Sequence, residues 1–128
     1  MFVRFVIDDR DLSSGRRQGL FQAAAELDDR GAFAGELGQR YAALVRWFDD
    51  HLGEPSRLSL SSRPNAKAQA ISWFKAGRHE HLGRMHELRR LIEAAGVQVR
   101  VLRTARPGYV VYEDEVQVAA CPFADTPS

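Results

Sequence analysis

Three of the four histidines in this chain lie within eight positions, at His79, His81 and His86. Imidazole nitrogens bind zinc, and histidine acts as an acid or base near neutral pH. On a helix, 100° per residue places His81 on the apolar face and His79 with His86 on the opposite face. Metal-binding helices space their histidines four apart, whereas Gly83 and Met85 occupy those positions. The sequence therefore predicts no metal or cofactor, a His81 that faces inward with a backbone or carboxylate partner, and a solvated His79 and His86.

The same helical geometry predicts a basic stripe of side chains that could contact a polyanion. Residues 63–106 carry ten Lys and Arg against three Glu, a net charge of +7, whereas residues 1–62 carry −2 and residues 107–128 carry −4. Either the basic segment is an exposed patch that binds phosphates, or the acidic flanks cover it. Arg103 and Arg106 would strengthen the first interpretation if they project to the same side. The stripe consists of Arg78, His79, His86, Arg89 and Arg90.

A cluster of carboxylates follows the first predicted strand, at Asp8, Asp9 and Asp11. Strand ends often hold ligands, and clustered carboxylates suit Mg²⁺, so a phosphate-directed or metal-assisted enzyme is one hypothesis. Asp is also common in loops and helix caps, and no second acidic cluster completes the site. The lone Cys121 is typical of a small buried hydrophobe, and no serine has nucleophile-elbow context. We therefore predict no catalytic residue.

Residues 63–75 combine basic side chains with two adjacent aromatic rings. A helix cannot direct both Trp73 and Phe74 fully to one core, so Trp73 lies either nearer the edge or, as the favoured position, in the core. A partly exposed Trp beside basic residues is typical of a protein-interaction hot spot. A predicted hairpin with an acidic tip adds further contacts, or its tip forms internal salt bridges. The predicted interaction residues are Arg63, Lys67, Trp73, Lys75, Tyr109, Tyr112 and Glu113.

Hydrophobic periodicity and turn residues predict the elements that position these side chains. Helices are expected at 16–29, with Ser13 or Ser14 as N-cap, at 34–52 and over a long region 66–95. Gly31 and Gly96 stand where C-terminal helix glycines belong, and Gly77 could divide the long helical region. Strands are expected at 2–8, 57–62, 97–104, 108–112 and 116–120.

This order predicts an α+β two-layer sandwich, with a mixed sheet of 4–5 strands (β-α-α-β-α-β-β-β) and helices mainly on one face. The 57–62 strand, the long helix and the 97–104 strand would form a right-handed βαβ crossover. The 128 residues suit a single domain, 1–128, with residues 124–128 frayed.

Composition limits the function classes. The single cysteine indicates a reducing compartment, which we expect to be the cytoplasm, and no apolar run is long enough to span a membrane. We predict a non-enzymatic binding or regulatory module that acts through protein contacts, with homodimerisation left open. The alternatives are nucleic-acid binding through residues 63–90 and the enzyme that would use Asp8, Asp9 and Asp11.

Overall fold

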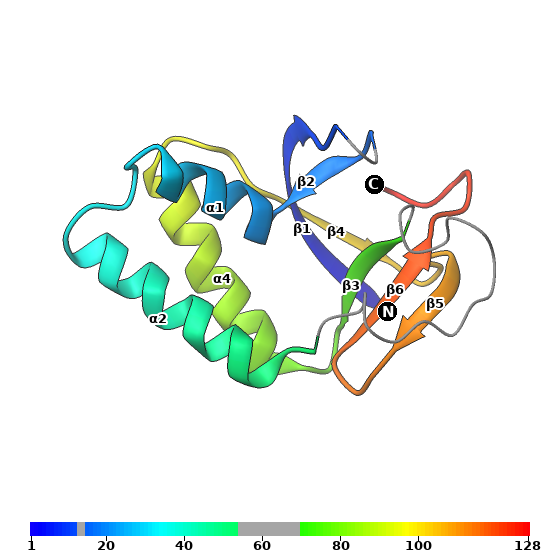
Figure 1. Cartoon of the computed structure of the whole chain (residues 1–128). Coiled ribbons are helices and arrows are strands. Elements are labelled where there is room, and N and C mark those ends of the chain that lie inside the picture. The colour runs from blue at the N-terminus through cyan, green and yellow to red at the C-terminus, as the bar shows by residue number, and fades with distance from the viewer. Residues whose placement is uncertain (13–14, 54–69) are drawn as a thin grey trace.

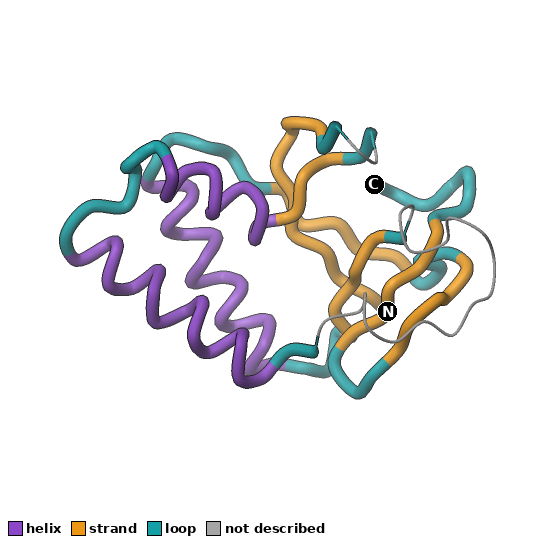
Figure 2. Tube along the Cα trace, viewed as in Figure 1, coloured by secondary structure: helices purple, strands orange, loops and turns teal. Residues whose placement is uncertain are grey.

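A computed structural model describes residues 1–12, 15–53 and 70–128. Within these ranges three helices form one layer against a six-stranded sheet (Figures 1 and 2). The predicted two-layer α+β fold, with helices on one face, is therefore confirmed. The elements are β1 (Phe2–Arg10), β2 (Arg17–Gly19), α1 (Leu20–Asp29), α2 (Glu36–His51), β3 (Ile71–Lys75), α4 (His79–Ala94), β4 (Arg100–Thr104), β5 (Tyr109–Glu113) and β6 (Gln117–Cys121).

The sheet is organised around β1. One edge of β1 pairs with β4, and the other edge pairs first with β3 and then with β2, so these two strands diverge along it. The order continues from β3 to β6 and β5. Every pairing among the described strands is antiparallel, so the prediction of a mixed sheet is wrong for this part of the chain. The crossover predicted from strand 57–62 lies outside the described residues.

Strand β3 replaces part of the predicted long helix. Ile71–Lys75 pairs with β1 on one edge and β6 on the other, so the helix prediction for 71–76 is wrong. β-branched and aromatic side chains favour a pleated, buried strand. Here the strands on either side of β3 provide hydrogen-bond partners for its backbone. The division near Gly77 is confirmed, because α4 begins at His79. A short strand, β2, likewise occupies the start of the helix predicted at 16–29.

Glycines end two of the helices as predicted. Gly31 has φ of +79°, its N–H donates to the Asp28 carbonyl, and the Ala32 N–H donates to the Leu27 carbonyl. This is the Schellman arrangement, which needs a residue in the left-handed region, and Gly96 ends α4 in the same way. None of the helices in the described ranges is both long and apolar enough to cross a membrane.

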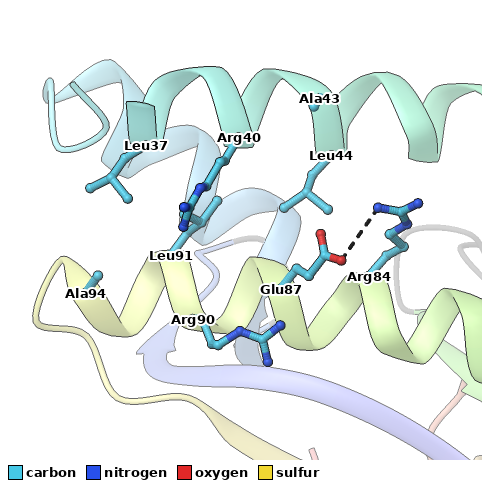
Figure 3. A pocket seen from close by; sticks show the side chains of 9 residues that line it. All are labelled: Leu37, Arg40, Ala43, Leu44, Arg84, Glu87, Arg90, Leu91 and Ala94. Carbon is cyan, nitrogen blue, oxygen red and sulfur yellow. Dashed lines mark ion pairs between the residues drawn. The ribbon is translucent and has the colours of Figure 1, made fainter. Parts of the chain in front are cut away.

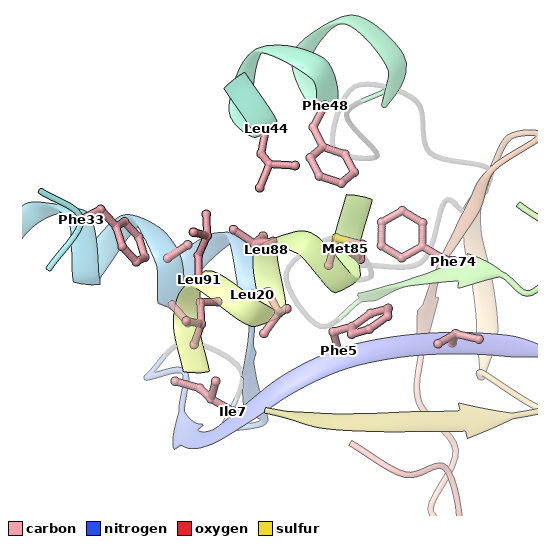
Figure 4. Close-up of a cluster of buried hydrophobic side chains, with 14 residues drawn as sticks. Phe5, Ile7, Leu20, Phe33, Leu44, Phe48, Phe74, Met85, Leu88 and Leu91 are labelled. Atoms are coloured by element: carbon pink, nitrogen blue, oxygen red, sulfur yellow. The ribbon is translucent and has the colours of Figure 1, made fainter. Parts of the chain in front are cut away.

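The main core lies between the helices and the sheet. Alternate residues of β1, Val3, Phe5 and Ile7, point toward the helices and are buried there. Figure 4 shows side chains from β1, β3 and the three helices meeting in this layer. The helices contribute Leu20, Ala23, Ala24, Leu44, Phe48, Met85, Leu88, Leu91 and Ile92.

A second, smaller core covers the opposite face of the sheet and contains Trp73. Phe74 pairs with Val3 and faces the helices, so its neighbour Trp73 points the other way. The Trp73 side chain is 0% exposed, and Leu102 of β4 and Val110 of β5 both pack against its cluster. The sheet therefore curls around Trp73. The favoured core position for this residue is confirmed, and the partly exposed edge position that would make it an interaction residue is wrong.

The C-terminal residues are tied to the domain. The Thr126 hydroxyl is buried, accepts a hydrogen bond from the Phe123 N–H and donates to the Arg106 carbonyl. Arg16 donates to the Ser128 hydroxyl at 2.9 Å. Thr126 and Ser128, in the segment expected to fray, thus form hydrogen bonds with the rest of the domain.

Candidate functional site

An apolar groove runs between α1 and α2. Phe21 of α1 and Val45 of α2 are 44% and 38% exposed on its walls. The Phe21 ring meets the Phe48 ring edge to face, with centroids 5.0 Å apart. The groove has a volume of about 240 Å³, and its lining is completed by Tyr41, Leu44, Asp49 and Leu88. Exposed large apolar side chains gathered at a hollow are typical of an interaction site.

Carboxylates lie at both ends of this groove. Burial raises the pKa of Tyr41, and the negative charges of Asp28 and Asp29 raise it further, which places both carboxylates near the Tyr41 end. Asp49 lines the other end. A ligand with apolar side chains and positive flanks would therefore complement the groove.

A deeper cavity of about 310 Å³ continues from the groove and shares Phe21, Phe48 and Asp49 with it. Figure 4 shows Phe48, Phe74, Met85 and Phe5 pointing toward one another from α2, β3, α4 and β1. Its polar lining residues are Arg4, Asp49, Ser72 and Gln117, together with the indole-bearing Trp73. The cavity is therefore apolar over most of its wall and polar at Asp49 of α2 and where β1, β3 and β6 line it.

Arg4 is the cation of this cavity. Its Nη2 donates to the Arg17 carbonyl at 2.8 Å, whereas its buried Nε has no partner among the described residues. Burial lowers the pKa of Arg4 to about 10, and the negative charge of Asp11 offsets only part of this effect. The guanidinium is thus held in a site where nearby charges do not fully compensate it.

The histidines behave differently from one another. His81 Nε2–H donates to the His51 carbonyl at 2.8 Å, and its ring meets Trp47 edge to face, so the inward, backbone-paired prediction is confirmed. His79 is exposed, as predicted. His86 is half-buried, with its ring centroid 4.9 Å from that of Phe5, because α4 packs against the sheet as well as the other helices. No group of three metal-binding side chains forms within the described ranges.

Basic side chains gather around His86. Burial lowers the pKa of His86, and the positive charges of Arg89, Arg90 and Arg103 lower it further. Arg103 of β4 therefore lies on the same side as the α4 arginines. Arg89 pairs with Glu93 at 3.1 Å, whereas Arg90 and Arg103 have no ion pair with any carboxylate in the described part of the chain.

The remaining members of the predicted basic stripe lie elsewhere. Arg78 binds the acidic hairpin tip, donating to the Glu115 carbonyl at 2.6 Å. A second groove, between α2 and α4, has a volume of about 450 Å³ and is lined by Arg40, Arg84 and Arg90 (Figure 3). Glu36 pairs with Arg40 at 2.8 Å and Glu87 pairs with Arg84 at 3.5 Å, so two of its three cations are neutralised locally.

The predicted protein-contact residues do not form one surface. Besides Trp73, Tyr112 is buried, and its hydroxyl donates to Asp114 at 2.8 Å. Lys75 pairs with Glu113 at 2.8 Å, so the hairpin tip forms internal salt bridges. Tyr109 is 43% exposed. Arg63 and Lys67 lie outside the described residues.

Of the three strand-end carboxylates, Asp8 forms ion pairs in the described structure. Asp8 accepts two hydrogen bonds from Arg100, at 2.6 and 3.1 Å, and lies 3.6 Å from Arg17. The hydrogen bond from Arg100 is the largest cause that lowers the pKa of Asp8. Asp11 accepts from Gln22 at 3.3 Å, and Asp9 is exposed. Asp8 and Asp11 are thus tied to neighbouring side chains rather than to a shared cation position.

The groove residues were missed from the sequence, although one signal pointed to them. Phe21 stands one position from the Leu20–Ala24–Leu27 stripe of α1, where a large apolar ring can remain partly outside the core. Comparison of the chain with protein-family models, with curated proteins and with solved structures finds no match.

Proposed function

We propose that this chain is a non-enzymatic binding module that recognises a protein segment in the groove between α1 and α2. The observation that carries the proposal is the pair of half-exposed side chains, Phe21 and Val45, on the walls of an apolar hollow. Burying an apolar side chain against a partner contributes roughly 25 cal/mol per Å² of covered surface. These two residues therefore offer the largest gain from contact along this groove.

The charges at the groove ends define the partner. Asp28 and Asp29 near Tyr41, and Asp49 at the far end, favour a segment whose apolar side chains are flanked by Lys or Arg. An amphipathic helix presents such side chains at positions i, i+3, i+4 and i+7, and binds apolar grooves of this kind. We assign the groove to a basic amphipathic helix of another protein.

The test uses a designed helical peptide with Leu at those positions and Lys on both flanks. Backbone amide NMR signals of α1 and α2 should shift on titration, and Phe21→Ser should weaken binding at least tenfold. Arg46→Ala is the matched control, because Arg46 is exposed on α2 and does not line the groove. Binding should weaken as salt is raised, since the flanking carboxylates contribute.

Three outcomes would contradict this assignment. The peptide might leave α1 and α2 unshifted, or Phe21→Ser and Arg46→Ala might bind it equally well. Concentration-dependent shifts of the same residues without peptide would instead assign the groove to a second copy of the chain.

A second candidate function, polyanion binding, is favoured by the position of Arg103. Arg90 and Arg103 both lie near His86, and neither forms an ion pair with a carboxylate of the described residues. A phosphate bound there would replace repulsion by attraction and raise the pKa of His86. A 12-nucleotide single-stranded DNA should raise the NMR-measured pKa of His86 in wild type but not in Arg103→Gln. A pKa of His86 that does not respond to DNA at low salt removes this candidate.

We also propose that the module works in the cytoplasm, on the basis of its single cysteine, Cys121. A fluorescent fusion visualised in the source cell would test this location. A fusion found outside the cytoplasm would contradict it.

A further inference from the structure

Two buried N–H groups lack a hydrogen-bond partner among the described residues, and both residues line the deeper cavity. They are the Nε of Arg4 and the Nε1 of Trp73. The pairing of Val3 with Phe74 makes Arg4 and Trp73 the next opposed residues on β1 and β3, at the point where β2 and β3 diverge along β1. Buried donors are almost always bonded, so two unpaired donors on residues that line one cavity indicate a missing acceptor.

The acceptor that Arg4 favours is an anion. In the described structure its guanidinium has a hydrogen bond to a neutral carbonyl, that of Arg17, and no ion pair. A cation removed from water is strongly destabilising unless it is paired and hydrogen-bonded. A carboxylate suits the fork of an arginine, since its two oxygens can accept parallel N–H bonds.

The rest of the cavity wall favours an apolar body. Aromatic and aliphatic side chains form it, and the about 310 Å³ of space accommodates a ring with a short chain. Asp49 stands at the junction with the outer groove, where it would repel a second negative charge. The apolar wall consists of Phe5, Leu20, Phe21, Phe48, Leu52, Phe74 and Met85.

We infer that this cavity binds a small monocarboxylate, with the carboxylate at Arg4 and the Trp73 indole N–H and an aromatic or branched apolar body among the phenylalanines. This site is distinct from the proposed helix groove, although the two share Phe21, Phe48 and Asp49. A free carboxylic acid and the carboxylate of a peptide present the same chemistry here. Side chains from both layers of the fold line the cavity, and its volume of about 310 Å³ suits a small molecule.

The test compares two probes that differ only in charge, 4-phenylbutyrate and 4-phenylbutan-1-ol. Of the two tryptophans, Trp47→Phe removes one, so the remaining indole N–H signal in the NMR spectrum belongs to Trp73. Phenylbutyrate should shift this signal saturably and bind at least tenfold more tightly than the alcohol. A peptide that ends in phenylalanine is tested with a free and with an amidated C-terminus. This comparison shows whether the cavity binds the carboxylate of a peptide.

Substitution of Arg4 separates charge recognition from packing. Arg4→Met should abolish the preference for the acid over the alcohol, whereas Arg10→Met, at an exposed arginine of the same strand, should preserve it. Should Arg4→Met fail to fold, Ser72→Phe provides a second variant, because Ser72 lines the cavity from an exposed position. A phenylalanine there should fill the space and abolish the shift of the Trp73 signal.

Equal affinity for acid and alcohol, or a Trp73 signal that does not move, would overturn the inference. Tighter binding of the free-ended peptide than of phenylbutyrate would overturn the assignment to a small molecule. Val45→Ser distinguishes the two sites, since Val45 lines the outer groove alone. This substitution should weaken binding of the helical peptide and leave phenylbutyrate binding unchanged.

Discussion

At the scale of single residues, one carboxylate organises the β5–β6 turn. Asp114 accepts hydrogen bonds from the backbone N–H groups of Val116 and Gln117, at 2.8 and 2.9 Å, and from the Tyr112 hydroxyl at 2.8 Å. The Gln117 side chain links the same carboxylate, at 3.2 Å, to the Gly53 carbonyl, at 2.8 Å. The turn is thereby tied to the end of α2 and to the edge of the deeper cavity.

Asp114→Ala should lower the free energy of unfolding at pH 7 by about 2 kcal/mol, because hydrogen bonds to a charged group are worth about 1.5–3 kcal/mol. Urea unfolding followed by circular dichroism measures this loss. Glu115→Ala is the control, since its side chain is 91% exposed, and its effect should stay within about 0.5 kcal/mol. Equal losses for the two variants would contradict this role for Asp114.

The pH dependence of stability should follow from the same carboxylate. Burial would raise the pKa of Asp114, but the hydrogen bonds outweigh burial and the pKa is lowered overall. The native state therefore releases this proton more readily than the unfolded chain, whose aspartates titrate near 3.9. Its stabilisation is complete above about pH 4 and is lost as the pH falls through the lowered native value. Asp114→Asn should flatten that acid limb in urea titrations, and an unchanged slope would contradict the argument.

At the scale of elements, local signals were sufficient wherever one segment carried its own pattern. Helix α2 has a continuous apolar stripe, α1 and α4 end at glycines with positive φ, and β5 and β6 flank a three-residue turn that contains Asp114 and Glu115. Strand β3 could not be recognised in this way. Its pairing with Val3 and with Val118 joins segments far apart in the sequence, and its order of burial does not alternate.

The candidate site was harder to predict for the same reason. The cavity combines Arg4 from the first strand with Trp73 and Gln117, which only the sheet order brings together. Helical geometry did place His81 correctly, because its position depends on one helix alone. It missed the contact of His86 with Phe5, which depends on how that helix lies across β1.

The start of β5 depends on a glycine, and a matched pair of substitutions tests this. Gly108 has φ of +133°, and an added Cβ would collide with the Cys121 carbonyl. Gly108→Ala should therefore cost about 1–3 kcal/mol from its backbone conformation alone. Gly83→Ala, in α4 with open space at the Cβ position, should instead stabilise by about 1 kcal/mol. Thermal unfolding of both variants measures whether the first substitution destabilises the protein and the second stabilises it. A Gly108→Ala variant as stable as the wild type would show that the β5–β6 pairing can shift.

At the scale of the whole molecule, β1 joins two cores. Val3, Phe5 and Ile7 pack under the helices, while Phe2 packs with Trp73 on the other face of the same sheet. Side chains of one strand alternate between the two faces of the sheet. If β1 detached from one core, the side chains that it places in the other core would therefore be exposed as well. The two layers should therefore unfold together, as the prediction of a single domain requires.

The two tryptophans allow this cooperativity to be measured, since Trp47 packs with the helices and Trp73 lies in the core of the far face. Trp73→Phe leaves the helix-side probe, and Trp47→Phe leaves the far-face probe. Within each variant, the urea transition by fluorescence should coincide with that by far-ultraviolet circular dichroism. Trp73→Phe should have the lower midpoint, because it removes volume from a side chain that is 0% exposed. A fluorescence transition of Trp47 that precedes loss of the strands would show that the helical layer unfolds separately, and that β1 does not couple the two cores.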